Sequence, residues 1–123
     1  MNGMVTDYVA GLWLKQFTPA WFSLHVADPG RAGDIHSEAV GGSYKRLSGA
    51  FTAADARTIW LGVKLTWTGL PALVLTHIGI WDHSVKGKML SCAQLPPPFP
   101  SIKQGGSFSL AAKTYAISIG LPG

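Results

Sequence analysis

The chain has 123 residues, of which 47% are apolar and 13% are charged, and its net charge is +4. This length suits one domain, and the charged fraction lies well below the roughly 25% of ordinary globular domains. Protein interfaces are rich in aromatic and poor in charged residues. The composition therefore favours a single domain, residues 1–123, that assembles into an oligomer; a monomer with a generous core is the alternative.

The ten basic residues are scattered, and only Lys45 with Arg46 and Lys86 with Lys88 lie close together in sequence. A groove for single-stranded nucleic acid interleaves basic and aromatic residues, so the sequence argues against a nucleic-acid partner. The single cysteine, Cys92, excludes an intramolecular disulfide. No apolar run approaches the about 20 residues of a membrane span, and the first four residues lack the basic start of a signal peptide. We therefore expect a protein that is synthesised in the cytoplasm and does not insert into a membrane.

The first predicted element is a short helix over residues 6–17. Thr6 or Asp7 can serve as its N-cap, and Pro19 stops it. A helix this short is marginal alone and must dock, either on its own domain or on a neighbouring subunit. Its apolar residues recur at helical spacing and share one face, namely Tyr8, Val9, Leu12, Trp13 and Phe17.

The rest of the chain alternates with period two or forms short apolar runs between Gly, Pro and Asp turns, which predicts antiparallel strands. We expect strands at residues 21–27, 43–47, around 51, 58–67, 72–81, 88–95, 108–110 and 115–121. In the strand over 58–67, five residues point one way: Ile59, Leu61, Val63, Leu65 and Trp67. The prolines at 96–98 and 100 stop pairing, either as an extended segment or as a crossing from sheet to sheet.

About eight strands after one helix predict an all-β fold, an antiparallel β-sandwich with Greek-key or jelly-roll connections.

No catalytic, cofactor or metal site is predicted. Ser23, His25 and Asp28 are the residue types of a hydrolase triad, but no nucleophile elbow surrounds Ser23, and proximity in sequence does not make a triad. Asp82 and His83 could join another histidine at a surface metal, yet turn acids more often cap backbone amides. The glycines match neither the P-loop nor the dinucleotide spacing.

Three tryptophans suggest a ligand platform on which sugar rings could stack. Trp60, Trp67 and Trp81, with Asp82 and His83 close by, would form it. Aromatic residues on strands more often belong to the core or to a subunit interface, because each buries so much apolar area. Both readings stay open at this point.

Several short motifs occur in an order that resembles a known family. These motifs are the residues at 24–29 (Leu-His-Val-Ala-Asp-Pro), Ser37–Glu38, Gly41–Gly42, Tyr44, Arg46, residues 76–82, residues 106–108 and the strand over 115–119. Together they resemble small virion proteins of tailed bacteriophages, described as minor tail or tail-fibre-like proteins. The chain departs from that pattern at Val26, where Thr is usual, at residues 86–88, where paired glycines are common, and at its proline cluster.

The resemblance implies a non-enzymatic component of the virion, made in the host cytoplasm. A symmetric oligomer is expected, and a trimer would suit the threefold and sixfold sites of phage heads and tails. The protein would bind major capsid proteins, as a decoration of the capsid exterior, or tail proteins, as a minor tail or fibre protein. The alternative is a module that binds a host-surface glycan or receptor. The predicted interface residues are Leu12, Trp13, Phe17, Pro97 and Phe99.

Overall fold

The computed structural model describes residues 1–119 apart from 2, 34 and 55–56. Over these residues one α-helix precedes ten strands, all paired antiparallel. The predicted all-β sandwich with an N-terminal helix is confirmed, with ten strands in place of eight, while jelly-roll or Greek-key connectivity stays a prediction. The elements are α1 (Asp7–Leu14), the 3-10 helices η1 (Lys15–Phe17) and η2 (Ile35–Ser37), and the strands β1 (Ala20–His25), β2 (Leu47–Gly49), β3 (Thr58–Trp60), β4 (Leu65–Leu70), β5 (Leu73–Val74), β6 (His77–Trp81), β7 (Met89–Gln94), β8 (Ser101–Ile102), β9 (Gly106–Leu110) and β10 (Ala116–Ser118).

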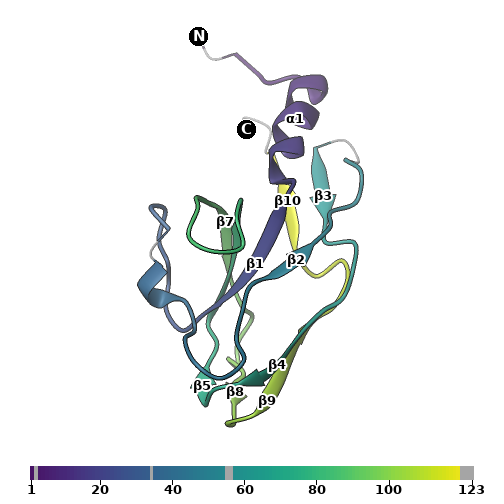
Figure 1. The fold of residues 1–123 in the computed structure, drawn as a ribbon. Coiled ribbons are helices and arrows are strands. Elements are labelled where there is room, and N and C mark those ends of the chain that lie inside the picture. Colours follow the sequence, from purple (N-terminus) through teal and green to yellow (C-terminus); the bar gives the residue numbers. More distant parts are fainter. Residues whose placement is uncertain (2, 34, 55–56, 120–123) are drawn as a thin grey trace.

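The main sheet has the order β2-β1-β6-β7, and three two-stranded ribbons, β10-β3, β4-β9 and β5-β8, complete the fold. Figure 1 shows α1 at one end of the molecule, above β10 and β3, with β4, β5, β8 and β9 at the other end. The central strands β1 and β6 are almost entirely buried. They are therefore covered on both faces, as the apolar character of the sequence over 72–81 predicts.

One hydrophobic core joins the main sheet to the β4-β9 ribbon. Phe22 and Ile80 of the main sheet belong to the same buried cluster as Trp67 and Leu110 of the ribbon. Tyr115 packs its ring edge-on to Phe22, with the ring centroids 5.8 Å apart. Each such side chain contributes about 1.5–3 kcal/mol by leaving water, and this shared burial holds the two layers together.

Two predicted strands are each divided in the structure. The segment over 58–67 becomes β3, which pairs with β10, and β4, which pairs with β9. Between them Val63 is exposed, contrary to the predicted single inward face, while Leu61 and Leu65 are buried. Between β3 and β4 the backbone leaves the ladder with β10 and hydrogen-bonds to another segment, since the amide of Gly62 donates to the carbonyl oxygen of Ala50. In the same way the segment over 72–81 divides into β5 and β6.

Two further corrections concern strand positions. Residues 43–46 are irregular, and β2 begins only at Leu47. The predicted strand over 43–47 is therefore wrong, and the reason is that the side chains of Tyr44 and Arg46 turn into a buried polar network. The last strand is shorter than predicted, and Leu121 lies outside the described residues. The prolines do form a crossing between sheets, since β7 belongs to the main sheet and β8 pairs with β5.

Candidate functional site

Helix α1 lies close to its predicted position. Thr6 caps it, with its hydroxyl oxygen 3.3 Å from the amide nitrogen of Val9, and η1 extends it to Phe17. Ala10 and Leu14 are the buried residues of α1, and Phe17 packs edge-on against Phe51. The helix thus docks on its own domain through a narrow face. This is one of the two predicted alternatives; docking on a neighbouring subunit would use the remaining surface of the helix.

The opposite side of α1 is apolar and exposed. Tyr8, Leu12 and Trp13, which we call the outer face of α1, are 76%, 41% and 49% exposed. At about 100° per residue, Tyr8 and Trp13 lie roughly 140° apart around the helix axis, and the residues between them in this arc, Val9 and Leu12, are also apolar. A helix that is apolar all round is normally a buried helix. The outer face therefore has the composition of a covered surface.

A groove lies beside this face. Its volume is about 440 Å³, and its walls include Tyr8 and Leu12 from α1 and the residues at 51–54. The groove extends the apolar surface of α1 onto the neighbouring loop.

Arg57 fixes the orientation of α1 relative to the sheets. Its guanidinium donates to the carbonyl oxygens of Val5 and Ile119, each at 2.9 Å, and to Asp7 at 2.8 Å. One side chain thus ties the start of the helix to the end of β10. Sequence reasoning missed this contact, because the partners lie about fifty or more residues away along the chain.

The five predicted interface residues come from two elements. Leu12 and Trp13 are exposed on α1, whereas Phe17 is half-buried against Phe51. In the proline crossing Pro97 is exposed, and Phe99 packs partly against the core. Their interface role stays a prediction, and the exposed members are the ones available for it.

The predicted tryptophan platform is not assembled in the structure. Trp67 and Trp81 are 2% and 1% exposed, and Trp60 alone of the three is exposed. Burial explains this outcome, since a strand tryptophan loses most contact with water when it joins the core. Asp82 accepts a hydrogen bond from the amide of Lys88, and His83 accepts one from the amide of Val85. Both residues therefore shape the turn after β6.

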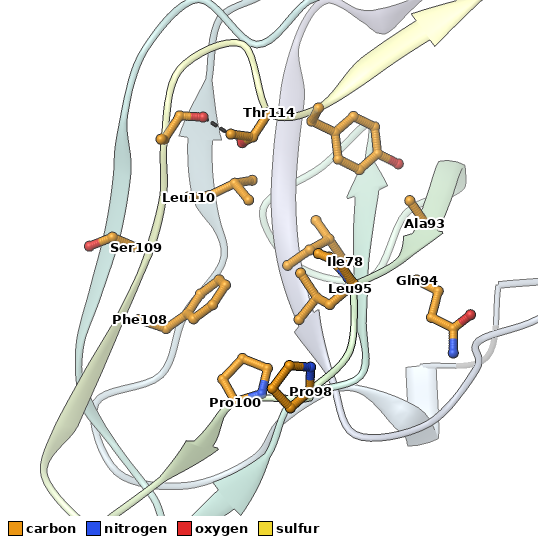
Figure 2. Close-up of a pocket in the computed structure, with 13 residues that line it drawn as sticks. Ile78, Ala93, Gln94, Leu95, Pro98, Pro100, Phe108, Ser109, Leu110 and Thr114 are labelled. Atoms are coloured by element: carbon orange, nitrogen blue, oxygen red, sulfur yellow. Dashed lines mark hydrogen bonds between the residues drawn. The ribbon is translucent and has the colours of Figure 1, made fainter.

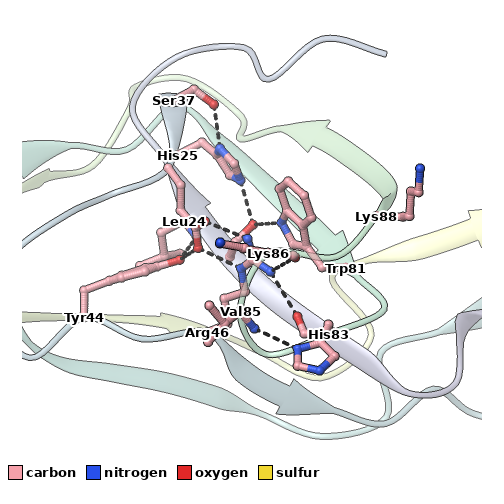
Figure 3. Close-up of polar contacts among 12 residues, drawn as sticks. Leu24, His25, Ser37, Tyr44, Arg46, Trp81, His83, Val85, Lys86 and Lys88 are labelled. Atoms are coloured by element: carbon pink, nitrogen blue, oxygen red, sulfur yellow. Dashed lines mark hydrogen bonds and ion pairs between the residues drawn. The ribbon is translucent and has the colours of Figure 1, made fainter. Parts of the chain in front are cut away.

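A buried polar cluster lies at the centre of the main sheet (Figure 3). The Ser23 hydroxyl is 2.6 Å from Nε2 of His25 and accepts a hydrogen bond from the Trp81 indole at 2.8 Å. Nδ1 of His25 is 2.7 Å from the Ser37 hydroxyl. Ser23 and His25 are both fully buried, so a substrate in solution does not reach Ser23 in this structure.

Gly79 faces this cluster across the sheet. It pairs with Ser23 in the ladder between β1 and β6. A Cβ atom at Gly79 would lie 2.6 Å from the Ser23 hydroxyl oxygen and 2.8 Å from Nε2 of His25. The glycine of the His-Ile-Gly-Ile-Trp motif is therefore required by the polar pair that packs against it.

A charged network seals the same region from the solvent side (Figure 3). Arg46 donates twice to Glu38, at 2.9 and 3.0 Å, and also donates to the carbonyl oxygens of His83 and Lys86. Its guanidinium carbon lies 4.0 Å above the Trp81 ring, a cation–π geometry. Arg46 is buried, and its hydrogen bonds to the carbonyl oxygens of His83 and Lys86 join the loop over 38–46 to the turn after β6.

Tyr44 completes the network. Its hydroxyl donates to Glu38 and accepts from the amide of Leu24 at 3.1 Å. Burial raises the pKa of Tyr44 far above its usual value, and the hydrogen bond to Glu38 acts in the same direction. The phenol therefore stays protonated and serves as a permanent donor. The sequence contained one signal for this network, namely that Glu38 and Arg46 are opposite charges in a chain with few charged residues.

A second apolar groove, of about 390 Å³, lies between β7 and β9, and we call it the β7–β9 groove. Figure 2 shows Phe108 and Leu110 of β9 pointing toward Ile78 and Leu95. Three prolines, Pro96, Pro98 and Pro100, and Tyr115 also line it. Burial raises the pKa of Tyr115 to about 12, while its hydroxyl is 2.8 Å from that of Ser91.

The described residues contain no group of three or more His, Cys, Asp or Glu side chains that could hold a metal ion. Among the helices of the same described ranges, none has the length and apolar character that crossing a bilayer requires.

Comparison with known proteins identifies a family. The family described as Podophage GP4 fiber I protein gp80 matches residues 4–118, a range that includes α1 and all ten strands. No curated protein gives a match. The family match confirms the resemblance to tail-fibre-like proteins of tailed phages, which rested on the order of short motifs. The chain belongs to the family of Podophage GP4 fiber I protein gp80.

Proposed function

We propose that this chain is a non-enzymatic structural subunit of a phage tail fibre, and that copies of it associate through the outer face of α1. The family match supports a position on the tail over decoration of the capsid, because the family is described as a fibre protein and the match extends over residues 4–118. The virion is then the place where the protein acts.

The observation that carries the association is the exposed apolar arc of Tyr8, Leu12 and Trp13. An aromatic side chain presents about 150–250 Å², so Tyr8 and Trp13 together leave on the order of 250 Å² uncovered. With Leu12 and the groove beside it, this patch reaches the size of the largest apolar patches on ordinary monomers, which are often functional. A second copy is the partner that presents an equally apolar surface.

The width of the arc favours more than one neighbour. A two-helix seam needs only a narrow apolar stripe, whereas the outer face extends over roughly 140°. A stable contact buries about 800 Å² on each partner, which one eight-residue helix does not supply against a single copy. A symmetric bundle, of which a trimer is the simplest, covers each outer face from two sides.

The test is the change Trp13→Ala in the full chain, with Val85→Ala as the matched control at another exposed apolar residue. Trp13 lies outside the buried face of α1, so we expect the unfolding midpoint to stay within a few degrees while the association constant falls at least tenfold. Light scattering across a concentration series and thermal unfolding of the same samples measure both quantities. The proposal fails if Trp13→Ala associates like Val85→Ala, or if it unfolds the free subunit.

Placement on the particle needs a separate measurement. Gold-labelled antibody against this protein, viewed on purified phage by electron microscopy, should mark the tail. Label over the heads would instead establish decoration of the capsid.

The competing function, a glycan-binding module, would require tryptophan fluorescence to change when host-surface glycan is added.

A further inference from the structure

The groove of about 440 Å³ beside α1, which we call the α1 groove, lies along one flank of that helix. The residues of α1 that line it are Asp7, Tyr8, Gly11, Leu12 and Leu14. The other wall is formed by residues 51–54 and Ile59. A Cβ atom added at Gly11 would meet nothing within 4 Å. The missing side chain of Gly11 therefore keeps the helical wall of the groove open.

Trp13 lies on the other flank of the same helix. At about 100° per residue, Trp13 and Gly11 are roughly 160° apart around the helix axis. Trp13 is 49% exposed, and it is not among the described residues that line the α1 groove. One helix thus carries a projecting aromatic side chain on one flank and a groove on the opposite flank.

This arrangement on opposite flanks determines the symmetry of a contact between copies. In a two-fold contact the same patch of each copy meets its counterpart, so Trp13 and the groove would have to share one face of α1. Because they lie on opposite flanks, one contact joins one Trp13 to one α1 groove and leaves a second Trp13 and a second groove for further copies. Repeated around an axis, such a head-to-tail contact closes into a ring of three or more copies.

We propose that Trp13 of each copy inserts into the α1 groove of the next copy and so builds a cyclic ring, of which a trimer is the smallest. This inference rests on the proposed association of copies through the outer face of α1. Figure 1 shows α1 at one end of the molecule, so the inserted side chain and the groove that receives it belong to the same end of neighbouring copies.

The lining of the α1 groove suits an indole ring. Pockets that receive small ligands measure about 300–1,000 Å³, so the groove has room for one tryptophan side chain. Phe51 and Ile59 supply apolar walls, and the ammonium group of Lys15 offers a cation for the face of the ring. A buried indole N–H needs an acceptor, and Thr18 and Thr52 carry hydroxyl oxygens at the groove. Tryptophan is also one of the residues that most often anchor an interface by filling a pocket.

Filling the α1 groove tests the insertion in the full chain. Gly11→Leu places a branched side chain in the groove, and Gly11→Ala, which adds only a methyl group at the same position, is the matched control. We expect Gly11→Leu to weaken association by roughly tenfold or more, while Gly11→Ala associates like the native chain. Ala53→Leu fills the groove from the opposite wall and should weaken association in the same way without a change in the helix.

Light scattering across a concentration series measures association, and thermal unfolding of the same samples shows that each variant is folded. If Gly11→Leu and Ala53→Leu associate like Gly11→Ala while Trp13→Ala associates weakly, the insertion is wrong and the proposed function stands.

A mixture of two defective variants gives an independent readout. Trp13→Ala keeps the α1 groove but lacks the inserted side chain, whereas Gly11→Leu keeps Trp13 but has a filled groove. We expect an equimolar mixture to form pairs, one copy of each variant, roughly tenfold or more tightly than either variant associates alone, and these pairs should not grow into rings. A mixture that associates no more tightly than its components would overturn the inference, and so would a native assembly of only two copies. A native chain that is monomeric at every concentration would overturn the inference and the proposed function together.

Discussion

The two most informative regions of this molecule invert the usual arrangement of side chains. At α1 three large apolar residues face outward, whereas Ser23 and His25 at the centre of the main sheet, and Arg46 in the loop beside them, are buried. The central polar groups are held by hydrogen bonds, so their burial is compensated. The apolar groups of α1 have no such compensation within the described chain. The comparison teaches that the polar centre is satisfied within the fold, while the apolar end is the surface through which we propose that copies assemble.

The largest expected effect would break the polar centre. Arg46→Met leaves the partly buried carboxylate of Glu38 without its bidentate partner, which should reduce the free energy of unfolding by about 3 kcal/mol, the lower end for buried pairs. Urea unfolding measures it, and Lys45→Met, at an exposed neighbour, should change stability by less than about 0.5 kcal/mol. Adding Glu38→Gln to Arg46→Met should recover part of the loss. Equal effects at the two basic residues would show that the network does not hold the fold.

Alkaline pH tests the buried phenols. Because burial raises the pKa of Tyr115 from 10 to about 12, the unfolded chain loses this proton first. Its contribution to stability is therefore complete below pH 10 and is lost as the pH rises toward 12, an effect of about 2–3 kcal/mol. Burial of Tyr44 acts in the same direction. Tyr115→Phe should flatten the fall seen in urea unfolding between about pH 9 and about pH 12; an unchanged slope would contradict the assignment.

Substitution of two glycines, one in each region, should change the stability of the protein in opposite directions. Gly79→Ala drives a methyl group against Ser23 and His25, so we expect a loss of about 1–3 kcal/mol. Gly11→Ala, in α1, meets no atom within 4 Å and should stabilise the helix by about 0.5–1 kcal/mol. Thermal unfolding of the two variants should move in opposite directions. A loss at both glycines would mean that α1 is more tightly packed around Gly11 than the structure shows.

The last prediction concerns the attachment of α1. Arg57→Ala removes the donors to Val5 and Ile119, at an expected cost of about 1–2 kcal/mol. Amide exchange should accelerate in α1 while the amides of β1 and β6 keep their protection. Asp7→Asn, which loses only an exposed ion pair, should cost no more than about 1 kcal/mol. Acceleration throughout the sheet would show that α1 belongs to the core rather than to a separable end.

The sequence predicted the elements that depend on local pattern. Thr6, the apolar spacing and Pro19 were enough to place the helix close to its observed bounds, and alternation was enough to predict an antiparallel all-β fold. The strand over 43–47 failed because the side chains of Tyr44 and Arg46 have partners far away in sequence, and a long-range hydrogen bond leaves no local periodicity. The sequence left the tryptophans open between a ligand platform and the core, because composition does not say which face of a strand meets the core, and the structure buries Trp67 and Trp81.

By itself, then, the sequence determined the class of fold, the helix, the break in pairing at the prolines and, through the order of its motifs, the resemblance to tail-fibre-like phage proteins. Only the tertiary structure decided that Ala10 and Leu14 are the buried residues of α1, that Tyr8, Leu12 and Trp13 remain outside, and that Glu38 meets Arg46. The physical reason is that local pattern fixes backbone conformation, whereas burial and pairing depend on which distant segments the folded chain brings together.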